Sequence, residues 1–113
     1  MHEVSLCMEV VSSLEDEAKS RGFARVRAVW IEVGQRRAVE PEAMRFAFDV
    51  VTQGTLAEGA RLHLEETPAR GWCFGCDREV VLDAAVVLCP RCGSPRTRVV
   101  SGEELRIRQI EVE

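Results

Sequence analysis

The chain has 113 residues, of which 46% are hydrophobic, and its 15 basic and 19 acidic side chains give a formal net charge of −4. This length fits one domain, or one domain with a small module, and the apolar fraction excludes a disordered chain. The acidic balance disfavours a general nucleic-acid binder, no apolar run reaches the roughly 18 residues of a membrane span, and the start lacks a secretory signal.

Two helices are predicted in the first half of the chain. Residues 4–21 read VSLCMEVVSSLEDEAKSR, and their apolar side chains recur at alternating steps of three and four, which is typical of an amphipathic helix capped by Gly22. The stretch VEPEAMRFAFDVVTQG indicates the second helix, with Pro41 at its first position and Gly54 at its end. The expected inward-facing residues are Val4, Cys7, Val11, Leu14 and Ala18 in the first helix, and Met44, Ala47, Phe48 and Val51 in the second.

Three further stretches have the pattern of strands. Residues 25–33, RVRAVWIEV, are rich in β-branched side chains, and ARLHLEE alternates with Ala60, Leu62 and Leu64 on one side. The end of the chain, EELRIRQIEVE, alternates again. We therefore predict an α+β fold, in which a small sheet with two helices is completed by the C-terminal strand and a cysteine-bearing module is inserted before that strand. The expected domains are residues 1–69 with 101–113, and residues 70–100.

The inserted segment carries two Cys-x-x-Cys pairs, Cys73 with Cys76 and Cys89 with Cys92. Two such turns facing each other place four sulfurs at the corners of a tetrahedron, which zinc prefers in closed structural sites. About thirty residues bury too little apolar surface to fold unaided, so bound metal would supply much of the stability. Iron with the same four ligands, or a redox-active Cys-x-x-Cys, is the weaker alternative.

Other conspicuous side chains have ordinary structural interpretations. Cys7 lies on the apolar face of the first helix and is expected to be a small buried side chain. His63 is expected to be a solvated surface residue, and Trp30 and Trp72 are expected to pack in the core or in the module. No nucleophile–base pair, phosphate-binding glycine loop or pair of catalytic carboxylates stands out, so we predict that the protein is not an enzyme.

The whole pattern resembles the HypA/HybF family of nickel metallochaperones, which act in [NiFe] hydrogenase maturation. The resemblance rests on the MHE start, on EVSLCMEVV, VWIEVG and VEPEAMRFAFDVVTQGTLAEGARLHLEETPA, on CFGC and CPRCGS, and on the closing GEELRIRQIEVE. It implies that His2 is the essential nickel ligand, with Met1 and Glu3 beside it, and that Cys73, Cys76, Cys89 and Cys92 hold structural zinc. It also implies transported Ni(II), a cytoplasmic location, and hand-over to the hydrogenase large-subunit precursor together with the GTPase HypB.

The N-terminal site is also reasonable on chemical grounds. The terminal amine and the amide nitrogen of His2 close a five-membered chelate ring, and that amide and the imidazole Nδ1 close a six-membered ring. Planar, nitrogen-rich sites suit Ni(II) or Cu(II), and Glu3 offers a further amide or a carboxylate. From the tripeptide alone, a histidine that merely precedes a helix is the commoner case.

Two points stay open at this stage. A zinc-ribbon adaptor in transcription or translation, with His2 incidental, is the alternative function, and a thiol–disulfide enzyme is the third. The resemblance also leaves open whether urease maturation factors are served in addition to hydrogenase, and we expect neither nucleic acid nor membrane as a partner.

Overall fold

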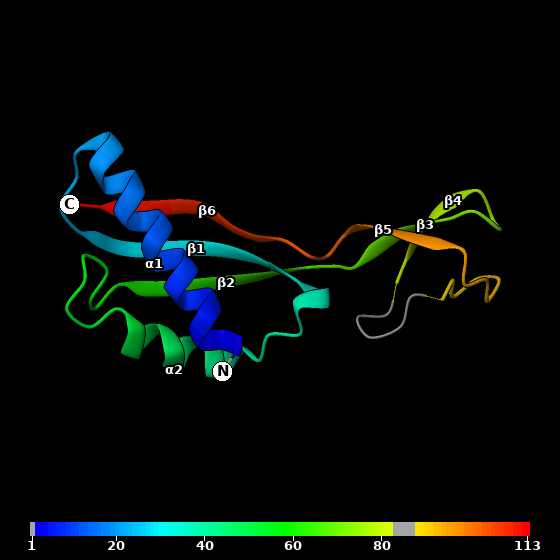
Figure 1. The fold of residues 1–113 in the computed structure, drawn as a ribbon, viewed down its shortest axis with the longest axis horizontal. Coiled ribbons are helices and arrows are strands. Elements are labelled where there is room, and N and C mark those ends of the chain that lie inside the picture. The colour runs from blue at the N-terminus through cyan, green and yellow to red at the C-terminus, as the bar shows by residue number, and fades with distance from the viewer. Residues whose placement is uncertain (1, 83–87) are drawn as a thin grey trace. The chain divides into compact units, whose positions relative to one another are not determined.

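The computed structural model describes residues 2–82 and 88–113 of the chain (Figure 1). Its elements mix two α-helices with two three-stranded sheets, which confirms the predicted α+β class. In chain order they are α1 (His2–Arg21), β1 (Val26–Gly34), the 3₁₀ helix η1 (Gln35–Arg37), α2 (Pro41–Val51), β2 (Arg61–Thr67), β3 (Arg70–Cys73), β4 (Arg78–Val81), β5 (Thr97–Ser101) and β6 (Leu105–Val112).

The first helix starts at His2, two residues before the predicted start, and ends at Arg21. Gly22 follows with a φ of 79°, and its N–H donates to the carbonyl of Ala18, as the predicted cap requires. Five side chains are buried: Leu6, Cys7, Val10, Val11 and Leu14. The predicted stripe was too narrow, because it omitted Leu6 and Val10 and included Val4 and Ala18, which are only half-buried.

The second helix begins at Pro41, as predicted, and ends at Val51, before Gly54. Its N-cap is Glu40, whose carboxylate accepts hydrogen bonds from the N–H groups of Glu42 and Ala43 at 3.3 and 2.8 Å. A carboxylate in this position satisfies donors that have no partner within the helix and lies at the positive end of its dipole. Met44, Ala47 and Phe48 are buried, and Val51 is half-buried.

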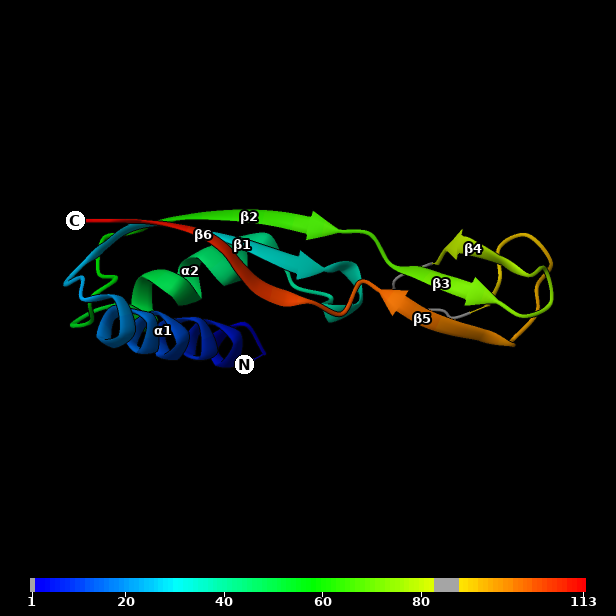
Figure 2. The same cartoon turned by 90° about the horizontal axis from the view of Figure 1, so that it is seen from above.

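The first sheet has the strand order β2-β1-β6, so the C-terminal strand pairs with β1 and completes the sheet as predicted. Both helices lie on the same side of this sheet (Figure 2). The largest fully buried side chains beneath them include Leu14, Val29, Ile31, Met44 and Phe48. Each burial of this kind stabilises the fold by about 1.5–3 kcal/mol, so this core is substantial for a small unit.

The second sheet belongs to the inserted segment and has the order β4-β3-β5, with both pairings antiparallel. Strand β3 alternates between buried Gly71 and Cys73 and exposed Arg70 and Trp72. The buried face packs in a small cluster with the cysteines, formed by Ala69, Cys73, Val80, Leu82 and Cys89 with half-buried Cys76 and Val99 against it.

Hydrogen bonds join three chain segments next to the second sheet, around residues 34–35, 67–69 and 102–104. The Glu104 carboxylate accepts hydrogen bonds from the Thr67 hydroxyl at 2.7 Å and from the Gly102 N–H at 2.6 Å. The side-chain oxygen of Gln35 accepts one from the Ala69 N–H at 3.0 Å. Gly34 lies so close to the backbone of Gly102 that a Cβ there would clash. Only glycine therefore fits at position 34 without a backbone shift.

The chain divides into two compact units, which consist of residues 1–31, 39–65 and 106–113, and of residues 32–38 and 66–105. The predicted division into a nickel-binding domain of residues 1–69 with 101–113 and a zinc-binding module of residues 70–100 stays a prediction. Neither helix in the described part of the chain combines the length and apolar character that crossing a membrane requires.

Candidate metal centres

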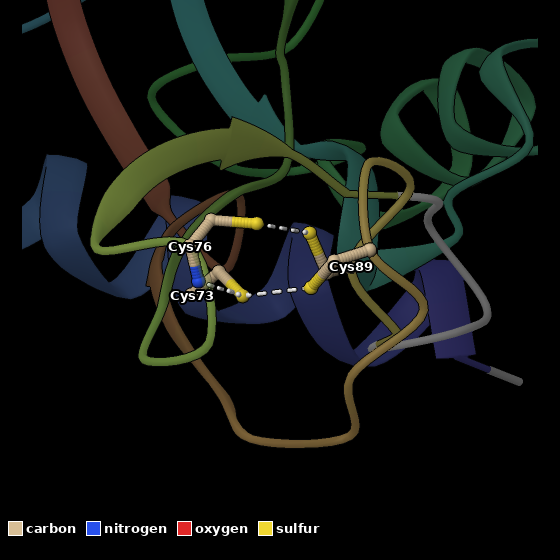
Figure 3. Close-up of side chains that lie close together, drawn as sticks. Cys73, Cys76 and Cys89 are labelled. Carbon is tan, nitrogen blue, oxygen red and sulfur yellow. Dashed lines mark hydrogen bonds between the residues drawn. The ribbon is translucent and has the colours of Figure 1, made fainter.

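The four cysteines of the inserted segment converge on one point. Their Sγ atoms all lie within 4.8 Å of one another, with Cys73 and Cys92 3.6 Å apart and Cys76 and Cys89 3.8 Å apart. Figure 3 shows the sulfurs of Cys73, Cys76 and Cys89 directed toward one another. A tetrahedral zinc ion with Zn–S bonds of about 2.3 Å requires sulfurs about 3.8 Å apart. The separations therefore fit zinc, and the predicted convergence of all four residues is confirmed.

Backbone N–H groups within each loop point at the cysteine sulfurs. The Cys76 N–H donates to the Sγ of Cys73, and the Arg91 N–H donates to the Sγ of Cys89, both at 3.4 Å. Such donors stabilise a thiolate, which is the form that binds a metal. A Cβ at Gly75 would lie 3.3 Å from the Ser94 Cβ and 3.4 Å from the Cys92 Sγ, so the two cysteine loops are in close contact there.

Without a metal ion, the thiols of Cys76 and Cys89 have opposite pKa shifts. Hydrogen bonding to the Cys92 thiol, followed by burial, raises the pKa of Cys76 to about 12. At Cys89 burial opposes ionisation, but backbone N–H groups of Cys92 and Arg91 outweigh it and lower the pKa to about 6. A bound zinc ion supplies the positive charge that holds four thiolates together. Because four protein ligands close the coordination sphere, the arrangement is that of a structural site.

The predicted nickel residues lie at the start of α1. His2 is the first residue of the helix and is exposed, while Met1 lies outside the described residues. The Glu3 carboxylate accepts a hydrogen bond from the Glu40 N–H at 3.3 Å. Hydrogen bonds from its own N–H and from that of Glu40 lower the pKa of Glu3. Sequence reasoning missed this contact with Glu40, because the two residues are 37 positions apart. The assignment of Met1, His2 and Glu3 to nickel stays a prediction.

The cysteine cluster and the N-terminus differ in the number of ligand side chains that they bring together. Within residues 2–82 and 88–113, the four cysteines are the group of three or more histidine, cysteine or acidic side chains whose ligand atoms converge. His2 and Glu3 offer only two such side chains.

The remaining conspicuous residues meet the sequence predictions only in part. Cys7 is fully buried, its Sγ lies 3.6 Å from the Met44 carbonyl oxygen, and burial raises the pKa of its thiol to about 11. His63 is exposed on β2, as predicted. Its ring stacks on that of Trp30, with centroids 4.5 Å apart, a contact that the sequence did not predict. Trp72 is exposed rather than packed in the module, contrary to expectation, because it lies on the face of β3 that points away from the cysteines.

The fold and the cysteine site define a small α+β protein with a structural four-cysteine zinc module. Comparison with known families identifies it further. A profile described as "Hydrogenase/urease nickel incorporation, metallochaperone, hypA" matches residues 1–112. The chain belongs to this HypA family of metallochaperones, which act in hydrogenase maturation. The match confirms the resemblance seen in the sequence.

Individual relatives match along their whole length. The chain is 50% identical to the hydrogenase maturation factor HypA of Acidithiobacillus ferrooxidans, 48% identical to that of Azotobacter vinelandii and 43% identical to HybF of Salmonella typhimurium, each over 113 residues and 100% of both chains. The solution structure of the Ni metallochaperone HypA from Helicobacter pylori superposes with a TM-score of 0.73 at 22% identity, covering 99% of this chain and 97% of that one. This last likeness concerns the fold alone.

Proposed function

We propose that this chain binds Ni(II) at its N-terminus, through the amine of Met1 and the amide and imidazole nitrogens of His2, with Glu3 beside them. It then delivers the ion for the maturation of [NiFe] hydrogenase and catalyses no reaction itself. The observation that carries the proposal is the match of residues 1–112 to a family described by nickel incorporation. Its cysteine cluster is a closed site, so the transported ion requires a second one.

The position of His2 in the fold supports this proposal. The first N–H groups of a helix do not donate to carbonyls one turn earlier, so metal binding to the His2 amide nitrogen removes no hydrogen bond from the ladder of α1. The imidazole is exposed and therefore accessible to an ion from solution or from a partner. The Glu40 N–H holds the Glu3 carboxylate next to this position. The negative charge of the carboxylate there offsets the positive charge of the metal.

Release of the ion follows from the same chemistry. The imidazole and the terminal amine bind a metal only in their unprotonated forms. Protons therefore compete with nickel for the nitrogens, and affinity falls as pH drops below neutrality. Competing ligands on a partner provide a second route. The expected partners are the hydrogenase large-subunit precursor and the GTPase HypB, and the expected location is the cytoplasm. Experiment must decide whether the chain also delivers nickel to urease maturation factors.

The decisive experiment compares nickel titrations of three zinc-loaded proteins at one pH: the untagged chain, an N-terminally extended chain and His2→Ala. Both changed proteins should lose tight nickel binding, because the extension converts the terminal amine into an amide and the substitution removes the imidazole. Intact mass must first establish that Met1 is retained in the untagged protein. A C-terminal extension without histidines is the matched control and should bind nickel normally. Equal affinity in all of these proteins would place the nickel site elsewhere.

A further inference from the structure

One face of the second sheet points away from the cysteine cluster. Along β3, Gly71 and Cys73 are buried, whereas Arg70, Trp72 and the following Phe74 are exposed. Side chains alternate between the two faces of a strand, so these three share the outer face. The inner face is already occupied by the small apolar cluster around the cysteines, and the zinc module therefore has no structural need for aromatic side chains on the outer face.

The register identifies the neighbours of these side chains. Trp72 lies opposite Glu79 on β4 and opposite Arg98 on β5, and Arg70 lies opposite Val81. The Phe74 N–H donates to the Arg96 carbonyl at 2.9 Å, which continues the ladder and places Arg96 beside Phe74. Directly opposed residues share a face. We call the resulting surface the Trp72 face; it consists of Arg70, Trp72, Phe74, Val81, Arg96 and Arg98, with Glu79 among them.

This surface combines exposed apolar groups with arginines. Trp72, Phe74 and Val81 have relative exposures of 37%, 49% and 54%. Clustered exposed apolar groups bordered by polar side chains are typical of interaction sites, and tryptophan and arginine are enriched among the residues that contribute most to binding between proteins. The composition is therefore that of a docking surface.

The charge of the Trp72 face is opposite to that of the whole chain. Its three arginines and one glutamate give a local balance of +2, whereas the chain carries −4. Arg70 is paired with Glu79 at 3.4 Å. The guanidinium groups of Arg96 and Arg98 are exposed, and neither forms a hydrogen bond or ion pair with the described residues. Two charged donors are thus available to carboxylates from outside the chain.

We propose that the Trp72 face binds an acidic segment of a protein partner, which packs an apolar side chain against Trp72 and Phe74 and directs carboxylates to Arg96 and Arg98. Arginine binds carboxylates through two parallel hydrogen bonds, which gives both strength and orientation. The proposal rests on the proposed function, because the partner is taken to be one of the proteins between which nickel is passed.

Two other occupants fit less well. A nucleic acid would place its phosphates next to the carboxylate of Glu79, which lies opposite Trp72. The net negative charge of the chain would also repel those phosphates. A symmetric pair of copies joined through this face would bring arginine against arginine, because such an interface uses the same patch on both subunits. An acidic protein segment satisfies both the charge and the apolar groups.

The test measures the affinity of the zinc-loaded, full-length chain for two purified probes, the hydrogenase large-subunit precursor and HypB of the same organism. Trp72→Ala and Arg98→Glu should weaken binding to at least one probe by about tenfold or more. Arg78→Glu is the matched control: it makes the same charge change on an exposed arginine of the same sheet, but Arg78 lies opposite Cys73 and hence on the other face. It should change affinity by less than about twofold, and raised salt should weaken wild-type binding more than binding of Arg98→Glu.

Zinc content and nickel titration of each variant separate this proposal from the proposed function. Both should match the wild type, because no substituted residue belongs to either metal site. Wild-type binding that persists unchanged in Trp72→Ala and Arg98→Glu would overturn the Trp72 face while leaving nickel carriage intact. Loss of affinity equal to theirs in Arg78→Glu would also overturn it. The proposal would also be overturned if a single-stranded oligonucleotide bound to the wild type but not to Trp72→Ala. A dimer that is seen by sedimentation and that Trp72→Ala dissociates would overturn it too. If the wild type binds neither probe, the expected partners and this proposal both fail.

Discussion

Asp77 and Gly93 hold the same position in the two cysteine loops. Each directly follows the second cysteine of its pair, and each donates its N–H at 2.8 Å to the carbonyl of the first cysteine, Cys73 or Cys89. Both have left-handed backbones, with φ of 56° and 73°. The two Cys-x-x-Cys segments are therefore near copies of one turn, which places two sulfurs on one side of each loop and brings the pairs together.

This relationship predicts the effect of substituting Gly93. A Cβ at Gly93 would meet nothing within 4 Å, so Gly93→Ala should cost only the strain of the left-handed backbone, about 1–2 kcal/mol. Because zinc binding and folding of the module are linked, zinc affinity should fall by about tenfold in competition with a chelator. Gly93→Asn is the control, since asparagine tolerates this backbone better and should cost less. Wild-type affinity in Gly93→Ala would show that the turn does not limit zinc binding.

Removal of the zinc should affect the inserted segment selectively. The purified chain should carry about one zinc ion, and Cys73→Ser should lose most of it, because Cys73 is buried among the other ligands. Hydrogen exchange should then rise across residues 70–98, whereas the amides of α1 and α2 should stay protected by their own core. Cys7→Ala provides the control and should keep its zinc. Full zinc loading after all four module cysteines are alkylated would exclude the assignment.

The role in the cell can be examined through nickel supply. Deletion of the gene should lower [NiFe] hydrogenase activity in nickel-limited medium, and added nickel should restore part of it, because a carrier raises local supply without performing the chemistry. Complementation with His2→Ala should fail, whereas Arg78→Glu should complement. Normal hydrogenase activity in nickel-limited cells that lack this gene and any paralogue would contradict the proposed role.

The sequence predicted those features that depend on short spacings. Apolar steps of three and four placed α1 and α2, and the double Cys-x-x-Cys pattern identified all four residues of the cluster. The start of α1 at His2 was missed because no serine, threonine, aspartate or asparagine marks an N-cap there. The buried face of α1 was predicted too narrow. The helix packs against both α2 and the sheet, and these two contacts together bury more than one line of side chains.

Contacts between distant segments were beyond sequence reasoning. The hydrogen bond from Glu40 to Glu3 joins the starts of two helices that are far apart in the chain. The exposure of Trp72 depends on which face of β3 covers the cysteines, and that follows only once β4 and β5 pair with it. Without the register of β3, a tryptophan next to a metal-binding cysteine is expected to pack inside the module.

Cys7 should be distinguishable from the other four cysteines by its reactivity. Its thiol is fully buried, and burial raises its pKa to about 11, so at pH 8 it is almost entirely protonated. After zinc is removed by a chelator under native conditions, the module should lose its fold and expose its four thiols, whereas Cys7 stays in the core of the first unit. A thiol reagent should therefore modify four cysteines quickly and one slowly. Peptide mapping should identify the slow one as Cys7, and Cys7→Ala should abolish only the slow phase. Rapid modification of Cys7 would show that the core of the first unit opens easily.

The same thiol should make the stability of the protein fall at alkaline pH. The pKa of Cys7 is raised from 9.0 in an ordinary environment to about 11 in the fold, so above pH 9 the unfolded chain loses the thiol proton while the folded chain keeps it. Stability from the neutral buried thiol is therefore fully present below pH 9 and is lost as pH rises towards 11, by at most about 1.4 kcal/mol per pH unit. Urea unfolding of the zinc-loaded wild type and of Cys7→Ala between pH 7 and pH 10.5 measures this effect. The difference between the two free energies of unfolding should be constant up to about pH 8.5 and should then change in favour of Cys7→Ala, since the module cysteines contribute equally to both. A difference that stays constant to pH 10.5 would show that Cys7 ionises in the folded protein as easily as in the unfolded chain.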